Sequence, residues 1–432
     1  GANGGNGGNG GNGGTGGNAY AYGMWDSGNA VVAVDSITAE ATGGNGGNGI
    51  NGSNGGNGSN GGNGGNGGNG GNGGTGGNAY AYGVWGGEKS VIKLTADTIT
   101  AKASAGDGGT AGTGGTGGQP GQNGLNGEAA EAYGVYAEKG AVITLNAKTD
   151  GGNGGTITIG AKAGNTATPE GSKAYAVYAD NATVLFNDNA VLNSDGTNPD
   201  DTVITYLNNA TLGFGSPAEG QNVGRTITGG TLQLAGSNTF KVATDLSNVT
   251  PNADKFTFAK LAADSSTATQ YITVGYDKAF DGSKLDSFIG DVTVLTITNL
   301  GADQNLNNFV GKESEMDDPL TRFLATPTVA VDGNDVKITK IDFEEAGASE
   351  TVMTAADAQM SIANLWRVEG NNLMKRMGEL RSDPEAAEGG VWARYYRGEM
   401  SADSAYDRSF DQDYTAFQGG IDKVQDYKGG KL

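Results

Sequence analysis

The chain contains no cysteine and no histidine among its 432 residues. The absence of cysteine excludes disulfides and thiolate metal sites, which fits a reducing cytosol as well as a chain that crosses an oxidising compartment unfolded. The absence of histidine excludes Ser-His-Asp and Cys-His catalysis and histidine-ligated zinc. An enzyme with this composition would depend on carboxylates, lysine, tyrosine or serine. We expect neither a metal nor a cofactor.

Positive charge and long apolar runs are also scarce. The chain has 27 Lys and Arg residues against 48 Asp and Glu, for a formal net charge of −21. No basic stripe is present to displace counterions, so we expect no nucleic-acid partner. No run approaches the roughly 18 apolar residues of a membrane-spanning helix. The chain opens on GANGGNGG without an initiator methionine and stops in mid-pattern at KVQDYKGGKL, so we interpret it as part of a longer protein.

Glycine is abundant, with 81 residues, and much of it is arranged in triplets. Gly-Gly-Asn triplets occupy residues 1–18 and 43–78, and a looser array with glycine at every third place occupies 109–127. Substitutions such as Ile50 and Ser53 fall in the middle place, so one glycine column stays unbroken. A period of three fits an extended left-handed threefold helix in which one column faces a crowded neighbour.

Three interpretations of the arrays are open. Composition favours a flexible glycine–asparagine spacer. Collagen is disfavoured because the chain has only 8 prolines. A packed sheaf of polyglycine-type helices, with asparagine on the outside, would explain the unbroken glycine column, which a spacer does not need. The sequence does not decide between the spacer and the sheaf.

A recurring β motif follows the arrays. It reads AYGMW at 21–25, AYGVW at 81–85, AYGVY at 132–136 and AYAVY at 174–178. Successive copies start 60, 51 and 42 residues apart, so each interval is three triplets shorter than the last. This indicates one β unit with a glycine-rich excursion of variable length, as in a repeat architecture. We expect one tyrosine of each AYGVY pair in the core and the other at the surface, and no ligand site there.

Short β patterns continue from the motifs to residue 345. Runs of Thr, Val, Ile and Leu alternate and are separated by Asn, Asp and Gly. This spacing fits a sandwich or a parallel β-solenoid, and excursions from a constant place favour the solenoid. We therefore expect a mostly β fold: triplet arrays with interleaved β repeats over 1–130, and a β-solenoid over 131–345.

A helical pattern takes over from Met353. Apolar residues recur at steps of three or four as far as Leu380, Thr354 with Asp357 resembles a capping box, and Pro384 ends the run. About 28 residues at 1.5 Å each give a rod of roughly 42 Å, longer than the roughly 30 Å core of a bilayer. Its Lys and Arg side chains would each cost about 2.5–3.5 kcal/mol in hydrocarbon. Such a helix would span a membrane only inside a water-lined pore.

The segments after the helix alternate as transmembrane β-strands do. In GVWARYYRG, Val391 and Tyr395 share one face, while Trp392 and Arg394 share the other. YTAFQGGIDK alternates in the same way. Segments of about 9–11 residues with this pattern and aromatic ends match strands of outer-membrane barrels. A soluble antiparallel hairpin would show the same pattern.

The order of EGNNLMKRMGELR, GVWARYY and YDRSFDQDYTAFQGGIDK resembles the linker helix and first two barrel strands of monomeric type V (type Va) autotransporters, over residues 353 to about 427. The resemblance implies a linker α-helix over 346–384 and the start of an incomplete transmembrane β-barrel over 385–432. It also implies an outer-membrane location in a Gram-negative cell, assembly by the barrel-assembly machinery and an extracellular passenger. The upstream repeats resemble a passenger only in pattern, with an autochaperone-like C-terminal part.

The same resemblance singles out Asn371 and Asn372 as candidate catalytic residues. Some family members cleave themselves at an Asn-Asn pair in this helix. The side-chain amide nitrogen of Asn371 would attack its own backbone carbonyl, form a succinimide and release the chain. The family has a bulkier residue at the place of Gly370 and a polar one at that of Met374, and further barrel strands supply the activating acidic groups. The alternative is that both amides only hydrogen-bond residues of the barrel lumen.

The sequence favours a structural or adhesive passenger displayed at the cell surface, with a host-cell or matrix ligand. Catalysis by the passenger is disfavoured, because no GxSxG or GDSGS motif is present and histidine is absent. Two carboxylates from distant turns would still allow a hydrolase of the glycosidase type. A binding module built on the polyglycine arrays is a third alternative. We therefore expect no enzyme, apart from the self-cleavage.

Overall fold

The computed structural model describes the chain except for residues 149–154, 194–201, 216–222, 246–251, 277–288, 318–319, 383–389, 405–407, 424–425, 428–429 and 432. The chain divides into two compact units. The first is Gly1–Ser314 with Ala325–Phe343, and the second is Glu315–Leu324 with Glu344–Leu432.

In the described part of the chain before the helix, the regular elements are short strands and one 3₁₀ turn. The strands are β1 (Ala19–Asp26), β2 (Asn29–Ala33), β3 (Ser36–Thr42), β4 (Ala79–Gly86), β5 (Val91–Thr95), β6 (Thr98–Ser104), β7 (Ala130–Glu138), β8 (Val142–Asn146), β9 (Thr156–Gly164), β10 (Ser172–Asp180), β11 (Thr183–Phe186), β12 (Asn189–Asn193), β13 (Val203–Asn208), β14 (Thr211–Phe214), β15 (Thr226–Ala235), β16 (Thr239–Asp245), β17 (Asn252–Ala253), β18 (Lys255–Leu261), β19 (Gln270–Tyr276), β20 (Ile289–Ile297), β21 (Phe309–Gly311), β22 (Ser314–Asp317), β23 (Thr321–Asp332) and β24 (Asp335–Ala348). The 3₁₀ turn is Pro169–Gly171.

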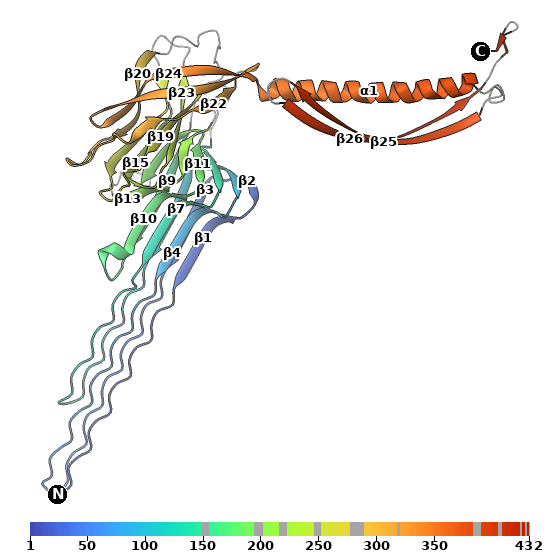
Figure 1. The fold of residues 1–432 in the computed structure, drawn as a ribbon. Coiled ribbons are helices and arrows are strands. Elements are labelled where there is room, and N and C mark those ends of the chain that lie inside the picture. The colour runs from blue at the N-terminus through green and yellow to red at the C-terminus, as the bar shows by residue number, and fades with distance from the viewer. Residues whose placement is uncertain are drawn as a thin grey trace. The chain divides into compact units, whose positions relative to one another are not determined.

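Equivalent strands of successive turns pair side by side in parallel (Figure 1). One column is β1-β4-β7-β10-β13-β15-β18-β20, a second is β2-β5-β8-β11-β14-β16-β19-β21, and a third is β3-β6-β9-β12-β15. Tyr22 pairs with Tyr82, and Tyr82 with Tyr133, so a motif interval is the length of one turn. These columns are consistent with a parallel β-helix. At the far end, β24 pairs with β20 in the antiparallel sense.

The core of the stack changes along its length. In the first turns alanine fills the space between the first and third columns, where Ala81, Ala132 and Ala101 are fully buried in one cluster, while Ile92 and Leu94 of the second column are buried as well. Alanine lets the two columns approach closely. Further along, the larger Phe240 and Phe256 fill the space between the columns.

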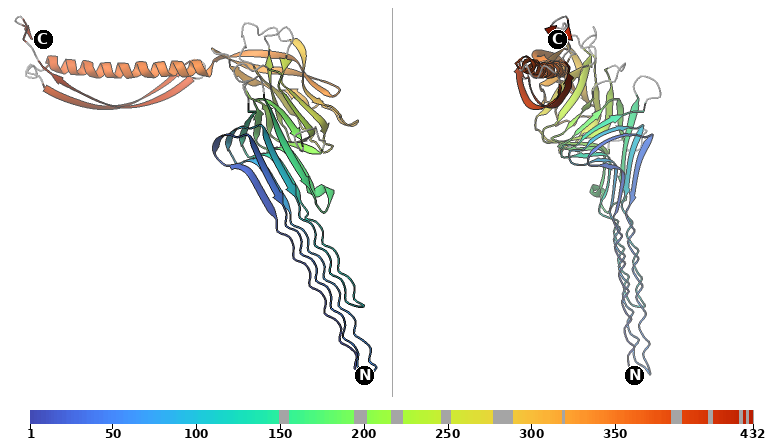
Figure 2. Two further views of the ribbon diagram at one scale, coloured as in Figure 1. Left: turned by 180° about the vertical axis from the view of Figure 1, so that it is seen from behind. Right: turned by 90° about the vertical axis from the view of Figure 1, so that its right-hand side faces the viewer.

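The triplet arrays are ordered, and they extend from the first turns as side-by-side segments (Figures 1 and 2). We call the whole bundle the sheaf. Its forward segments lead into β1, β4 and β7, and they are residues 1–18, 62–78 and 118–127. Its return segments leave β3 and β6, and they are residues 43–59 and 106–116. The N–H of Gly4 donates to the carbonyl oxygen of Asn63 in a parallel neighbour (2.9 Å), and that of Gly44 to Gly17 in an antiparallel one (2.8 Å). The packed-sheaf interpretation is therefore right, and the flexible spacer is wrong.

In segment 1–18 the unbroken glycine column is the side that touches neighbouring segments, whereas in segment 62–78 the middle place is crowded as well, because a Cβ on Gly68 would lie closer than 3.0 Å to the carbonyl oxygen of Gly8. A Cβ on Gly10 would lie closer than 3.0 Å to the carbonyl oxygen of Ile50. A Cβ on Gly14, in the middle place of the same segment, would meet no atom within 4 Å. The strict column therefore reflects the close approach of neighbouring backbones.

Asparagine does more than cover the outside of the sheaf. The Oδ1 atom of Asn3 accepts the backbone N–H of Asn63 (3.1 Å), and the Oδ1 atom of Asn69 accepts the N–H of Gln119 (2.9 Å). The same bond recurs along the return segments. The asparagine side chain thus supplies an acceptor for a backbone donor that the glycine carbonyls leave unpaired.

The second unit contains helix α1 (Glu350–Ser382), of 33 residues. The helix begins before the expected capping box, because the Ser349 hydroxyl accepts the N–H of Val352 (3.3 Å) and the Ser349 carbonyl accepts that of Met353 (2.9 Å). Ser349, and not Thr354, is therefore the N-cap. Among the described residues, no helix has the length and apolar character needed to cross a membrane.

Two long strands follow the helix, β25 (Gly390–Ser404) and β26 (Arg408–Asp422), and they form an antiparallel hairpin (Figure 1). Two short strands, β27 (Asp426–Tyr427) and β28 (Gly430–Lys431), pair with each other. The hairpin has the alternation expected from the sequence. Val391 pairs with Ile421, and these two side chains are 82% and 80% exposed. The intervening residues lie on the opposite face and include Arg394, which bonds α1.

Candidate functional site

Asn371 and Asn372 lie within α1, in different surroundings. Asn371 is exposed, whereas Asn372 is buried. The Nδ2 atom of Asn372 donates to the carbonyl oxygen of Val368, one turn back in the helix (3.1 Å). The Arg394 guanidinium of β25 donates to the backbone carbonyl of Asn372 (2.7 Å). The hairpin therefore holds the main chain of the pair, and Asn372 directs its amide to its own helix.

Polar groups continue this contact along the helix. The Nε2 atom of Gln412 in β26 donates to the Ser361 hydroxyl (2.6 Å), and the Nδ2 atom of Asn364 donates to the Oε1 atom of Gln412 (3.1 Å). The hairpin thus has a polar face against α1 and, around Val391 and Ile421, an apolar face away from it.

The tyrosines of the repeat motif form an aromatic ladder on the outer face of the first column. One row is Tyr22, Tyr82, Tyr133 and Tyr175; the other is Trp25, Trp85, Tyr136, Tyr178 and Tyr206. Neighbouring tyrosines in the rows stack with ring centroids 4.7–5.2 Å apart. Tyr133 also contacts Tyr136 edge-on, at 5.1 Å.

The expected division of each tyrosine pair is confirmed in burial, since Tyr133 is 8% exposed and Tyr136 is half-buried, but it is wrong in direction, because both rings lie on the same face. Two residues separate Tyr133 from Tyr136, and the pairing register passes over Gly134 between them. This extra residue breaks the strict alternation, so both rings lie on the outer face while Ala132 and Val135 are buried in the core. The rings cover one another's faces, and we assign the ladder a structural role.

Burial governs the acidity of the ladder. It raises the pKa of Tyr82 and of Tyr175 to about 12. Burial also raises the pKa of Tyr133, and the Glu131 carboxylate adds to this by accepting a hydrogen bond from its hydroxyl (2.7 Å). These three tyrosines are thus protonated at neutral pH.

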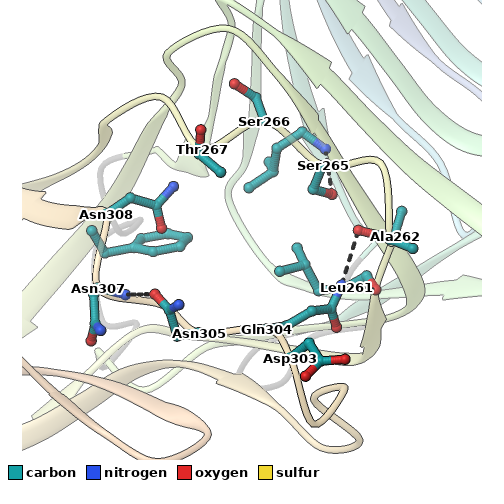
Figure 3. Close-up of a pocket in the computed structure, with 13 residues that line it drawn as sticks. Leu261, Ala262, Ser265, Ser266, Thr267, Asp303, Gln304, Asn305, Asn307 and Asn308 are labelled. Carbon is teal, nitrogen blue, oxygen red and sulfur yellow. Dashed lines mark hydrogen bonds between the residues drawn. The ribbon is translucent and has the colours of Figure 1, made fainter.

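A polar pocket of about 490 Å³ lies beside the loops after β18 and β20 (Figure 3). Its polar groups are occupied by the loops themselves. The Nε2 atom of Gln304 donates to the carbonyl oxygens of Leu261 and Ala262 (both 3.1 Å), and the Oδ1 atom of Asn305 accepts the N–H of Asn307 (3.1 Å). These bonds hold the loops in place, so we do not assign this pocket a ligand.

A larger groove, of about 610 Å³, lies where the sheaf meets the stack. Its lining includes Thr15, Thr75, Leu125 and Glu128. This groove was not predicted from the sequence, although one signal was visible: Thr15 and Thr75 replace asparagine at the same place of two arrays. Within the described part of the chain, no group of three or more acidic side chains is placed to hold a metal ion.

No protein-family model matches the chain, and no solved structure matches it. Over 69 residues the chain is 39% identical to the pertactin autotransporter of Bordetella bronchiseptica, a match that covers 16% of this chain and 7% of that protein. The pertactin autotransporter of Bordetella parapertussis matches to the same extent. Over 88 residues the chain is 40% identical to the serine protease EspC of Escherichia coli O127:H6, covering 20% of this chain and 6% of that protein. The matches thus span less than a tenth of these relatives' length, and over that part they make the chain an autotransporter-related protein.

Proposed function

We propose that the chain is a passenger displayed on the surface of a Gram-negative cell, with a structural or adhesive role, joined to its own secretion apparatus. In this proposal the parallel stack and the sheaf are the passenger. Helix α1 is the linker that passes through an outer-membrane barrel, and the hairpin is the first part of that barrel. The matches to autotransporters support this assignment.

The two faces of the hairpin are the observation that carries the proposal. Val391, Tyr395, Phe417 and Ile421 are 65–82% exposed on one face, where lipid would cover them. On the other face, Arg394 and Gln412 bond polar groups of α1, namely the backbone carbonyl of Asn372 and the hydroxyl of Ser361. This arrangement is that of a barrel strand between lipid and a water-filled lumen.

Substitution of the apolar face tests the proposal. In the chain with its native continuation, V391R and I421R should each cost about 2–4 kcal/mol if they face the bilayer midplane, and should abolish surface display. The control is S401R, on the same face but beyond the apolar band. Protease accessibility of the sheaf on intact cells is the measurement. Undiminished display of V391R and I421R would overturn the proposal.

Self-cleavage at Asn371-Asn372 is a second proposal, and it is favoured by one contact. Arg394 donates to the carbonyl of Asn372 and so holds the chain next to the scissile bond. The exposed Asn371 side chain has no hydrogen-bond partner among the described residues. Mass spectrometry of the full-length protein in outer membranes should find the chain cut after Asn371, and N371D should stay intact. An uncut native chain would remove this proposal and leave the passenger assignment standing.

Passenger catalysis is the alternative to an adhesive role. The relative EspC is named as a serine protease. Because this chain has no histidine, a His-dependent serine protease mechanism is not available to its residues, and a hydrolase built on carboxylates remains the form such catalysis would take.

A further inference from the structure

The groove between sheaf and stack lies across the three forward segments at a single level. Gly16 donates its N–H to the carbonyl oxygen of Thr75 (2.8 Å), and Gly76 donates its N–H to that of Leu125 (2.9 Å). Thr15, Thr75 and Leu125 therefore occupy equivalent places in neighbouring segments. All three line the groove.

The asparagine pattern is intact on both sides of this level. Before it, the N–H of Asn72 bonds the Oδ1 atom of Asn12 (2.9 Å), and that of Gln122 bonds the Oδ1 atom of Asn72 (2.8 Å). After it, the N–H of Asn78 donates to the Oδ1 atom of Asn18 (2.9 Å). The N–H of Ala129 in turn donates to the Oδ1 atom of Asn78 (3.0 Å). Side-chain oxygens thus accept each of these backbone donors.

At the groove level this pattern is interrupted. Threonine takes the place of asparagine in both Thr15 and Thr75, and its side chain is too short to repeat the bond. Among the described residues, the N–H groups of Thr75 and Leu125 have no hydrogen-bond partner. Two adjacent parallel segments thus present one free backbone donor each in the groove, next to two hydroxyl groups.

The rest of the lining defines the chemistry of a ligand. Glu128 contributes a carboxylate, and Leu125 contributes an apolar side chain that is 66% exposed. The amides of Asn78 and Asn126 also line the groove, but Asn78 already accepts the N–H of Ala129, and Asn126 accepts that of Gly108 and donates to Asn165. The lining contains no lysine or arginine. A phosphate, a sulfate or an acidic sugar would meet a carboxylate with no cation to balance it. A molecule rich in hydroxyl groups, with acceptors for the free N–H groups, a donor for Glu128 and a C–H face for Leu125, matches the lining.

We propose that this groove binds a neutral sugar unit of a surface glycan. The biological use rests on the proposed surface display, because only a displayed groove would meet glycans of another cell. Its volume of about 610 Å³ falls in the range of about 300–1,000 Å³ typical of small-molecule sites. Backbone N–H groups and Thr hydroxyls bind the ring and hydroxyl oxygens, and Glu128 accepts a hydrogen bond from a sugar hydroxyl.

The double variant T15N/T75N tests the proposal, because it restores the interrupted pattern. The new amides would accept the free N–H groups and fill the groove, so the unfolding temperature should stay the same or rise. Sugar binding should fall at least tenfold. Loss of binding in a variant that is no less stable is not explained by misfolding. The control is T113N in a return segment, where the N–H of Thr113 is already bonded to Asn51 (2.8 Å), and this variant should bind as the unchanged chain does.

The probes are galactose, glucose and N-acetylglucosamine, with sialic acid and a heparin fragment as charged comparisons. Saturation-transfer NMR on the purified full chain should show binding of at least one neutral sugar and of neither charged one. The proposal is overturned if no neutral sugar binds at millimolar concentration, if the charged probes bind instead, or if T15N/T75N binds as well as the unchanged chain. Because this assay uses purified protein, its failure leaves the display proposal intact, and a failure of display leaves the sugar result intact.

Discussion

Gly10 and Gly14 are glycines of the same segment, yet substitution by alanine should change the free energy of unfolding in opposite directions at the two positions. Gly10→Ala places a Cβ closer than 3.0 Å to a backbone oxygen that cannot move aside, and we expect a loss of about 1–3 kcal/mol or more. Gly14→Ala meets open space at a backbone φ that is not positive, and we expect a gain of about 0.4–1 kcal/mol from reduced unfolded-state freedom. Thermal unfolding of the two variants is the measurement. Equal effects would contradict the packed sheaf.

Arg225 and Asp254 form a buried ion pair that joins several parts of the stack. The Nη2 atom of Arg225 lies 2.7 Å from Asp254, the two side chains are 5% and 0% exposed, and Asp254 also accepts the N–H groups of Gly224, Arg225 and Ala243. Asp254→Ala would leave a buried guanidinium uncompensated, so we expect a loss of about 3–5 kcal/mol.

The matched control for this pair is Glu40→Ala, which removes the exposed pair with Lys102 (2.8 Å). Exposed pairs contribute about 0–1 kcal/mol. Urea unfolding should therefore separate the two variants clearly. A similar midpoint for both would show that the buried pair is dispensable.

Single residues also show how far the sequence alone reaches. The glycine column can be recognised in the sequence because the close contact with a neighbouring backbone repeats at every third residue. The acceptor role of Asn3 and the alignment of Thr15 with Thr75 and Leu125 could not be predicted from the sequence. Both depend on the register between segments that lie 50 or 60 residues apart in the chain. The outward direction of Tyr136 was missed because one extra residue at Gly134 shifts the alternation.

At the scale of elements, the aromatic ladder makes the fold sensitive to alkali. The pKa of Tyr82 and Tyr175 rises to about 12 in the folded chain, against an ordinary value of 10.0. The stability that this difference contributes is fully present below pH 10. It is lost as the pH rises from 10 to 12, because the unfolded chain then releases protons that the folded chain retains.

Tyrosinate absorbance followed together with circular dichroism is the measurement for the ladder. We expect ionisation of the buried tyrosines to coincide with loss of β structure above pH 10. The double variant Y82F/Y175F lacks these two phenols and should lose less stability over the same range. An identical alkaline transition in the variant would assign the sensitivity to other groups.

The helix and the strands differ in how well the sequence locates them. The alternation of Val391, Trp392 and Arg394 was sufficient to assign the two faces of the hairpin, because a strand has a period of two. The start of α1 was placed too late, because Thr354 and Asp357 have capping chemistry but lie inside the helix. Ser349 caps it instead, directly after the end of β24, and that depends on where the strand ends.

At the scale of the whole molecule, the parallel repeat architecture followed from the intervals of 60, 51 and 42 residues. Each interval is the length of one turn, as the register Tyr22–Tyr82–Tyr133 shows directly, and the two longer intervals also include an excursion into the sheaf. The groove belongs to no single turn, since three arrays must lie side by side before Thr15, Thr75 and Leu125 share one level. For this reason the parallel repeat architecture was predictable and the proposed sugar site was not.

The sheaf is held by backbone hydrogen bonds and encloses almost no apolar side chains. Unfolding it would therefore expose mainly peptide groups, whose hydration lowers the heat capacity, whereas unfolding the alanine- and phenylalanine-filled stack raises it. The arrays should contribute stability that changes little with temperature. The sheaf should therefore stay rigid in the cold as well as at moderate warmth.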